Sequence, residues 1–343
     1  MPNLTPEKAH LIIPGAVAEH DRDGPSAALA PLTPNLRALL AAMAPAERIE
    51  CADDSPATPF ELALARANGL PGAPGYIAFA AFEAGIRLRA RRLHQGRPGY
   101  MPDSAVEADT AGLPCAFVHL CHWQMGSDHV LLSPPEDLAI DDEVSHALLC
   151  AMAPYFLEDG MTLQACESLP GTWLATGEPF RHLRCISIDR LRGRRLTRSM
   201  LESAGASAAT LRRLQNEMQM LLYTHLANDV RQRQGLLPVN SFWIAGAGAL
   251  EQAVQPMPGL RVESRLSAPA VRRDAAAHAR AWHEVDADSC AILLATLRAG
   301  GDVRLTLCGD NATQAFIPAK AGFWPTVKSY LGLKPIWDGR NQL

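Results

Sequence analysis

The sequence predicts a mixed α/β protein in which a mostly parallel sheet is flanked by helices. Short apolar runs with strand character alternate along the chain with longer segments whose apolar residues recur at helical spacing. Of the 343 residues, 48% are hydrophobic and 20% are charged, which is an ordinary globular composition. We expect one α/β domain over residues 1–343, made of two halves, 1–140 and 141–343.

The predicted strands are short runs bounded by turn residues. His10–Pro14 is apolar after its first residue and leads into a loop, which is typical of a buried strand. In Cys115–His122, side chains alternate between the two faces, so Cys121 and His122 point to opposite sides of the sheet. The other predicted strands are His129–Leu132, Met161–Cys166, Thr172–Thr176, Cys185–Asp189, Ser241–Ala245 and Val303–Cys308.

The predicted helices have apolar residues on one face and start or stop signals at their ends. Asn35 can cap Asn35–Met43, and Thr58 can cap Pro59–Asn68, where a proline suits the first turn. Ala208–Gln234 is the most regular segment, and Gly235 supplies its stop. The other predicted helices are Tyr76–Leu93, Asp141–Phe156, Val271–His283 and Cys290–Arg298.

The loops, charge and cysteines restrict the class of protein. Residues 95–110 are rich in Gly, Pro, Asp and Ser and predict a mobile loop. The net charge is −4, so the sequence lacks the excess of positive charge that is typical of nucleic-acid-binding proteins, and we expect no nucleic-acid partner. The apolar stretch Leu11–Ala18 is far shorter than the about 20 residues of a membrane helix, and no signal-peptide pattern occurs, so we expect a cytoplasmic protein without a membrane partner. The eight cysteines include no CxxC pair and are expected to be reduced thiols. The oligomeric state is left open.

Cysteine and histidine gather in the segment from Cys115 to His129. Such side chains can bind a transition metal. Alternatively, one cysteine and one histidine can form a nucleophile pair. The candidates are Cys121 and His122 for catalysis, and His122, Asp128 and His129 for a metal. The alternative is structural, with an Asp128–His129 turn hydrogen bond.

A second polar cluster lies at the end of the long predicted helix and in the strand after it. On a helix, His225 lies one turn before Asn228 and Asp229, and Arg231 follows. A tight connection would bring Asn240 back beside them, Trp243 follows in the strand, and the turn at 246–248 would let backbone approach a ligand. These residues are the candidate ligand-binding group, with His225 as a candidate proton donor. The alternative is a network that caps the helix.

Several common catalytic motifs are absent. Gly246-Ala-Gly-Ala-Leu-Glu251 has glutamate where a dinucleotide fingerprint requires its third glycine. The sequence contains no GxxxxGK[ST] loop, no GxSxG elbow and no HExxH pair. Each absence argues against one class of enzyme.

Four segments carry a resemblance to known families. Arg212–His225, Leu237–Trp243 and Cys121–Val130 resemble the bacterial regulatory proteins of the RpfE type, over most of the chain. Arg231–Gly248 is similar to a stretch of the archaeal-type cofactor-independent phosphoglycerate mutases. Those mutases belong to the alkaline phosphatase superfamily, so the resemblance implies an alkaline-phosphatase-like α/β fold, two divalent metals and a nucleophilic Ser or Thr.

The chain departs from that superfamily where its metals are bound. The first strand of the superfamily ends in an aspartate ligand, but here the matching place reads Leu11-Ile-Ile-Pro-Gly15. A late Asp-His-Gly is replaced by Leu307-Cys-Gly-Asp-Asn311, which offers Asp310 but no histidine. The resemblance therefore implies a degenerate scaffold that lacks the two-metal centre.

These observations favour a regulatory protein that binds a small ligand, phosphorylated ligands included, and they assign it no cofactor. The alternatives are an active phosphoglycerate mutase or phosphatase-like metalloenzyme that uses a divalent metal, and a Cys/His enzyme or metal-binding protein that uses residues 115–129.

Overall fold

A computed structural model describes residues 8–17, 33–52, 54–73, 76–83, 112–126, 130–166, 169–192, 196, 205–252 and 254–319. The chain divides into two compact units: the first comprises Met1–Asn68 and Pro256–Leu343, and the second comprises Gly69–Gln255. Neither boundary coincides with the expected division at residue 140. The reason is strand pairing, because β5 (Cys115–Met125) pairs with β8 (Thr172–Thr176) and β9 (Ser241–Gly248) across that point.

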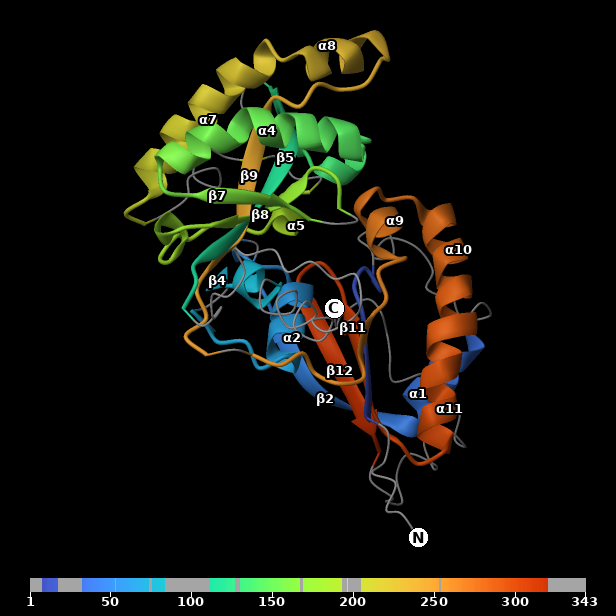
Figure 1. The fold of residues 1–343 in the computed structure, drawn as a ribbon. Helices are drawn as coiled ribbons and strands as arrows, with labels where there is room; N and C mark the ends of the chain where they lie inside the picture. The colour runs from blue at the N-terminus through green and yellow to red at the C-terminus, as the bar shows by residue number, and fades with distance from the viewer. Residues whose placement is uncertain are drawn as a thin grey trace, which may run out of the picture. The chain divides into compact units, whose positions relative to one another are not determined.

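The first unit is built on a five-stranded sheet in the order β10-β1-β11-β12-β2. β1 is parallel to both of its neighbours, whereas β11, β12 and β2 pair antiparallel. Figure 1 shows β1 and β2 in blue and β11 and β12 in red, because segments near both ends of the chain build the sheet together. The strands are β1 (Lys8–Ile13), β2 (Met43–Glu50), β10 (Leu260–Val262), β11 (Asp302–Cys308) and β12 (Ala312–Pro318).

One face of this sheet is buried under helices. Leu11 and Ile13 of β1 and Leu305 and Leu307 of β11 point to the same face of the sheet and enter a common apolar cluster. Side chains of three helices complete that cluster. The helices are α1 (Pro34–Ala42), α10 (Ala275–Val285) and α11 (Ala291–Arg298). The opposite face carries the polar members of the alternation and packs against α2 (Pro59–Ala67).

A π-helical turn, Asp286–Cys290, joins α10 to α11 and positions a buried carboxylate. Asp286 accepts hydrogen bonds from the backbone N–H of Leu36 at 2.7 Å and of Asn35 at 3.1 Å. It thus satisfies two of the free donors at the start of α1. The cap predicted from Asn35 itself is wrong, because the Asn35 side-chain amide donates to Asp286.

The second unit contains a sheet in the order β6-β5-β8-β7, with β9 paired to the free edge of β5. All of its described strand pairs are antiparallel. Its main apolar cluster lies between this sheet and the helices α4 and α7 (Figure 1). The remaining elements are β3 (Gly72–Ala73), β4 (Tyr76–Ile77), β6 (Val130–Ser133), α4 (Asp142–Glu158), β7 (Thr162–Ala165), α5 (Ile188–Leu191), α7 (Ala208–Tyr223) and α8 (Leu226–Arg233).

The mixed α/β class is confirmed, but the parallel part of the described sheets is confined to β10-β1-β11. Short connections explain the rest. β11 and β12 are joined by three residues, 309–311, and a connection that short permits only an antiparallel pair. β12 and β2 have no counterpart among the predicted strands.

Several predicted elements differ from the structure. The long helix Ala208–Gln234 is broken at Thr224 and His225 into α7 and α8. The segment Cys185–Asp189 is not a strand, because Ser187 caps the short helix α5. Tyr76–Ile77 is a strand rather than the start of a helix, and helical backbone is described only at 79–83. The predicted loop at 95–110 lies outside the described residues. Thr58 caps α2 as predicted, in a reciprocal pair with Glu61.

The predicted Gly246–Gly248 turn is instead part of β9. The pairing register with β5 shifts between Cys115 and Phe117, and Gly246 adopts a φ of 60° at this irregularity. A Cβ on Gly246 would lie 3.2 Å from the Phe117 ring and 3.3 Å from the Phe79 Cβ. The small residue therefore admits the protein's own side chains rather than a ligand.

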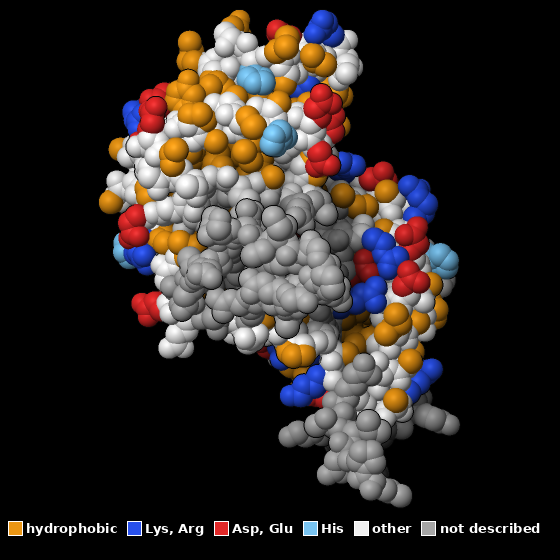
Figure 2. Space-filling view, viewed as in Figure 1, with side chains coloured by type: hydrophobic (Ala, Val, Ile, Leu, Met, Phe, Trp, Pro, Cys, Tyr) orange, Lys and Arg blue, Asp and Glu red, His pale blue; other side chains and the backbone are white. Residues whose placement is uncertain are grey.

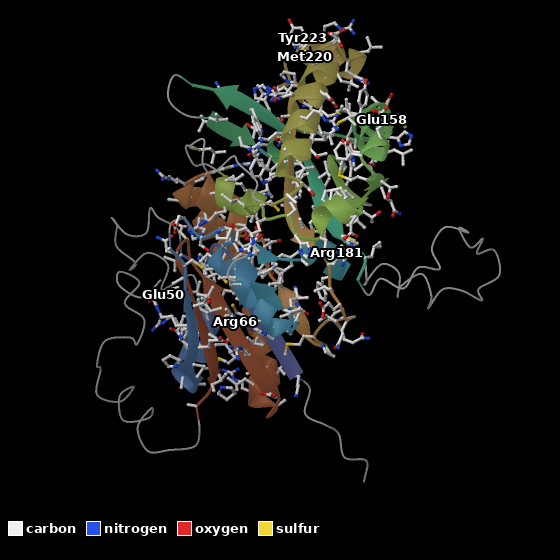
Figure 3. The ribbon with its side chains drawn as sticks, turned by 90° about the vertical axis from the view of Figure 1, so that its left-hand side faces the viewer. Glu50, Arg66, Glu158, Arg181, Met220 and Tyr223 are labelled. Carbon is white, nitrogen blue, oxygen red and sulfur yellow. The ribbon has the colours of Figure 1, made fainter. Side chains whose placement is uncertain are left out.

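The surfaces of the described helices mix polar and apolar side chains (Figure 2). Met220 and Tyr223 lie at the end of α7, with 72% and 83% of their surface exposed (Figure 3). No described helix is both long enough and apolar enough to cross a lipid bilayer.

Candidate functional site: a polar pocket on the sheet of the first unit

The helix-end cluster predicted from the sequence does come together in the second unit. His225 is half-buried and begins α8: its Nδ1 accepts the backbone N–H of Ala227 at 3.2 Å. Asp229 is exposed in the first turn of α8, where the helix dipole favours a carboxylate. Both placements are those of a helix start, since α7 has ended at Tyr223.

Asn228 and Arg231 are almost fully buried, and their polar atoms serve the backbone. Asn228 Nδ2 donates to the carbonyls of Leu222 and Val239 at 2.7 Å each, and its Oδ1 accepts from Val239 N–H at 2.8 Å. Arg231 donates from Nε to the Leu237 carbonyl at 3.0 Å, from Nη2 to the Leu138 carbonyl, and from Nη1 toward the Ala139 carbonyl at 3.4 Å. Burial lowers the pKa of Arg231, and the Asp141 carboxylate opposes that shift. This geometry supports the structural alternative for both residues.

Asn240 and Trp243 are committed in the same way. Asn240 forms a two-way pair with the backbone of Trp123, at 2.7 Å to its N–H and 2.9 Å to its carbonyl. Trp243 is 2% exposed, and its Nε1 donates to the Ile186 carbonyl at 2.8 Å. These side chains hold β9 against β5 and α5.

The Cys/His segment is divided between the two faces of β5, as the alternation predicts. Cys121 is 0% exposed, and burial raises the pKa of its thiol far above the ordinary value. His122 Nδ1 lies 2.8 Å from the Pro238 carbonyl oxygen. Because a nucleophilic cysteine requires an accessible thiolate, Cys121 does not fit that role. Asp128 and His129 lie outside the described residues.

The donor set does not fit a metal centre in the described part of the chain. No three side chains of His, Cys, Asp or Glu type gather there in a way that could hold an ion. β1 ends at Ile13 and is followed by Pro14 and Gly15, neither of which has a metal-binding side chain. A two-metal site needs a cluster of carboxylates and histidines, so no step through such a centre follows from these residues.

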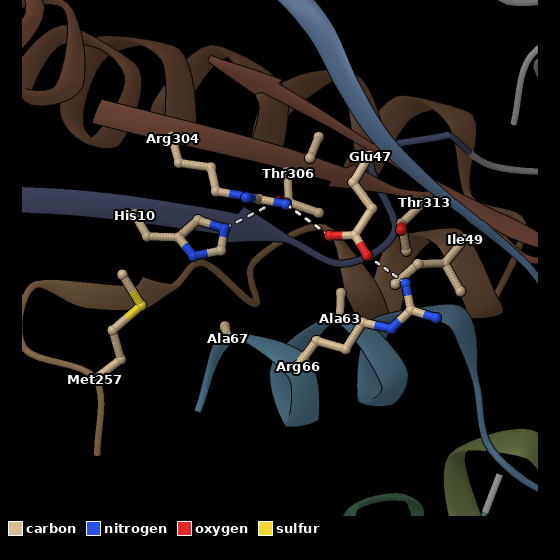
Figure 4. A pocket seen from close by; sticks show the side chains of 11 residues that line it. His10, Glu47, Ile49, Ala63, Arg66, Ala67, Met257, Arg304, Thr306 and Thr313 are labelled. Carbon is tan, nitrogen blue, oxygen red and sulfur yellow. Dashed lines mark hydrogen bonds and ion pairs between the residues drawn. The ribbon is translucent and has the colours of Figure 1, made fainter. Parts of the chain in front are cut away.

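A pocket of about 260 Å³ opens on the α2 side of the first unit's sheet. The alternation of each strand turns its polar residues to this face: His10 from β1, Arg304 and Thr306 from β11, and Thr313 from β12 (Figure 4). Glu47 of β2 and Arg66 of α2 complete the polar lining, and the rest is apolar. A pocket with an apolar floor and a few convergent polar groups is the usual form of a small-molecule site.

Charge in the pocket is organised around Glu47. One of its carboxylate oxygens bonds Nη1 of Arg66, and the other accepts from Nη2 of Arg304 at 2.8 Å. Nε of Arg304 is buried and has no hydrogen-bond partner. Two guanidinium groups face one carboxylate, so the lining has an excess of one positive charge.

His10 contributes a neutral polar group. Its Nε2 lies 2.8 Å from Oγ1 of Thr306, and the residue is 4% exposed. Burial lowers its pKa to about 4, and the positive charge of Arg304 adds to the shift. The ring is therefore uncharged at neutral pH and can donate or accept a hydrogen bond.

This shift predicts a loss of stability in acid. Between pH 6.5 and about 4 the unfolded chain holds a proton on His10 that the folded chain does not, so the free energy of unfolding should fall with decreasing pH. One such histidine contributes at most about 1.4 kcal/mol per pH unit. Urea unfolding of wild type and His10→Gln at pH 7 and pH 5 measures the contribution. An equal loss in both proteins would contradict it.

None of the six polar lining residues was predicted from the sequence as a site residue. They come from the five elements β1, β2, α2, β11 and β12, and only Arg304 and Thr306 belong to the same element. One signal was present: in Val303–Cys308, Arg304 and Thr306 alternate with apolar residues, which marks a strand with one polar face.

Comparisons with known proteins add little to this geometry. No family model matches the chain, and no curated protein sequence matches it. Among solved structures, a cofactor-independent phosphoglycerate mutase from Thermoplasma acidophilum DSM 1728 is 13% identical with a TM-score of 0.36, and covers 92% of this chain and 91% of its own. The PH0037 protein from Pyrococcus horikoshii is 14% identical with a TM-score of 0.43, covering 92% and 88%. At such scores neither likeness bears on the activity of this chain, and the resemblance to regulatory proteins of the RpfE type stays a prediction.

Proposed function

We propose that this protein binds a small anionic ligand, a phosphorylated one above all, in the pocket of its first unit. The observation that carries the proposal is the pair Arg66 and Arg304, whose guanidinium groups converge on the Glu47 carboxylate while Nε of Arg304 stays buried without a partner. Buried donors are nearly always satisfied, so a free one in a pocket favours an acceptor from a ligand. We therefore assign the ligand-binding role to Arg66 and Arg304, in place of Asn228, Arg231 and Asn240.

Binding, rather than turnover, suits the chemistry of the lining. An efficient general base has a pKa near the working pH, but His10 titrates at about 4. Guanidinium groups recognise phosphate by charge-assisted, two-point hydrogen bonds and do not take up protons. A protein that senses a metabolite by binding it fits the regulatory role that the sequence resemblance implies, and we include that role in the proposal.

The test is a titration of inorganic phosphate into wild type and Arg304→Gln, followed by isothermal calorimetry. Loss of a charge-assisted hydrogen bond costs about 1.5–3 kcal/mol, so we expect phosphate affinity to fall roughly 10- to 100-fold. The matched control is Arg48→Gln. Arg48 is on β2, bonds the exposed Glu50 at 2.7 Å and does not line the pocket. Equal affinities for all three proteins, or no binding by wild type, would refute the proposed site.

A further inference from the structure

Glu47 already occupies the point on which the two arginines converge. Its carboxylate bridges them, with one oxygen on Arg66 and the other on Arg304 (Figure 4). An external anion that binds between the same two guanidinium groups would need the same position. The ligand and Glu47 therefore compete.

The two ion pairs of Glu47 can be broken at low cost, because both are accessible to water. The side chain of Glu47 is 40% exposed, and that of Arg66 is 56% exposed. Ion pairs this accessible to water contribute about 0–1 kcal/mol each. The carboxylate also leaves Nε of Arg304 unbonded, although Nη2 of the same group is engaged. A phosphoryl group has three acceptor oxygens and can supply the missing partner.

We propose that Glu47 is an internal competitor whose carboxylate is displaced when the ligand binds, so that every anion binds more weakly than it would without Glu47, while the preference for phosphoryl dianions over carboxylates comes from the charge and the oxygens of the ligand. This inference rests on the proposed function. Exchange of one carboxylate for another leaves the charge between the arginines unchanged and gains no acceptor. A phosphate monoester brings about −1.5 to −2 charge at pH 7 and one more oxygen, so it gains from the exchange. The threonine hydroxyls and His10 then face the uncharged part of the ligand.

The experiment titrates inorganic phosphate, and separately acetate, into wild type and Glu47→Gln at pH 7. The amide keeps the shape of the side chain and removes its charge. We expect Glu47→Gln to bind phosphate about tenfold more tightly than wild type, because no carboxylate has to leave. Wild type should prefer phosphate to acetate. Displacement also predicts that acetate affinity rises by the same factor, since the cost removed belongs to Glu47 and not to the ligand.

The control is Glu50→Gln, which removes a carboxylate from the same strand. Glu50 forms an ion pair with Arg48, and neither residue lines the pocket. The control substitution should leave both affinities unchanged, and thermal unfolding confirms that each variant is folded. Unchanged or weaker phosphate binding by Glu47→Gln would show that Glu47 organises the arginines, and would overturn the inference. A larger gain for phosphate than for acetate would show that Glu47 stays in place and repels the dianion, which also overturns it. If wild type does not bind phosphate, the proposed function fails, and this inference fails with it.

Discussion

Replacement of Arg231 by alanine should destabilise the second unit by about 3–5 kcal/mol. The guanidinium group is 1% exposed and bonds backbone carbonyls of Leu138 and Leu237, which belong to two separate segments. Truncation leaves the carbonyl of the buried Leu138 without this donor, at about 1–3 kcal/mol, and opens a cavity where the side chain packed. Urea unfolding followed by tryptophan fluorescence measures the change, since Trp173 and Trp243 are buried in this unit.

Arg233→Ala is the matched control for that measurement. Arg233 is exposed on the same helix, where its Nε donates to the Asp229 carbonyl at 3.2 Å, so its loss should change the unfolding free energy by less than about 0.5 kcal/mol. A stable Arg231→Ala protein with weakened phosphate binding would reverse the assignment. It would restore Arg231 as a ligand contact, the role that the sequence pattern first indicated.

Replacement of Asp286 by alanine should cost the first unit about 3 kcal/mol. Asp286 is 2% exposed and accepts two backbone N–H groups and one side-chain amide at the start of α1. Without it, two donors of α1 stay buried and unpaired, and a favourable interaction of the carboxylate with the helix dipole is lost. The loss should appear in urea unfolding followed by circular dichroism.

Two further variants separate charge from shape at this cap. Asp286→Asn retains an acceptor oxygen and should lose less than half as much stability as the alanine variant. Asp274→Ala removes the exposed cap of α10, whose Oδ1 accepts from Ala277 N–H at 2.9 Å, and should cost about 1 kcal/mol. If Asp286→Ala were no more damaging than Asp274→Ala, the buried carboxylate would not be the anchor of α1.

Local signals predicted those elements whose stability is local. α2 has its capping pair and proline within one turn, and α4 has Asp141 as its cap, so both could be read from adjacent residues. The edge strand β2 contains Ala, Pro and Glu, which disfavour strands, and it forms because β12 pairs with it. Long-range pairing of that kind leaves no mark in the segment itself.

The candidate site was not predicted from the sequence, because its residues also come together only through long-range pairing. The polar cluster at 225–243 was conspicuous because its members are close in sequence, yet buried amides and guanidinium groups there satisfy backbone carbonyls. The pocket residues Arg66 and Arg304 are ordinary surface residues until the sheet places both beside Glu47. Density along the chain and convergence in space are different properties, and only the second makes a site.

The divided first unit has a consequence for how the chain is made. His10 and Thr306, which meet across neighbouring strands of one sheet, are 296 residues apart in sequence. The second unit is continuous over Gly69–Gln255, so all of its contacts become available before the last strands leave the ribosome. Strand β1 can pair with β11 only after residues 302–308 have been synthesised, and until then its apolar side chains lack this partner strand. This order makes the continuous unit the natural first folding event and the first unit the step most exposed to misassembly.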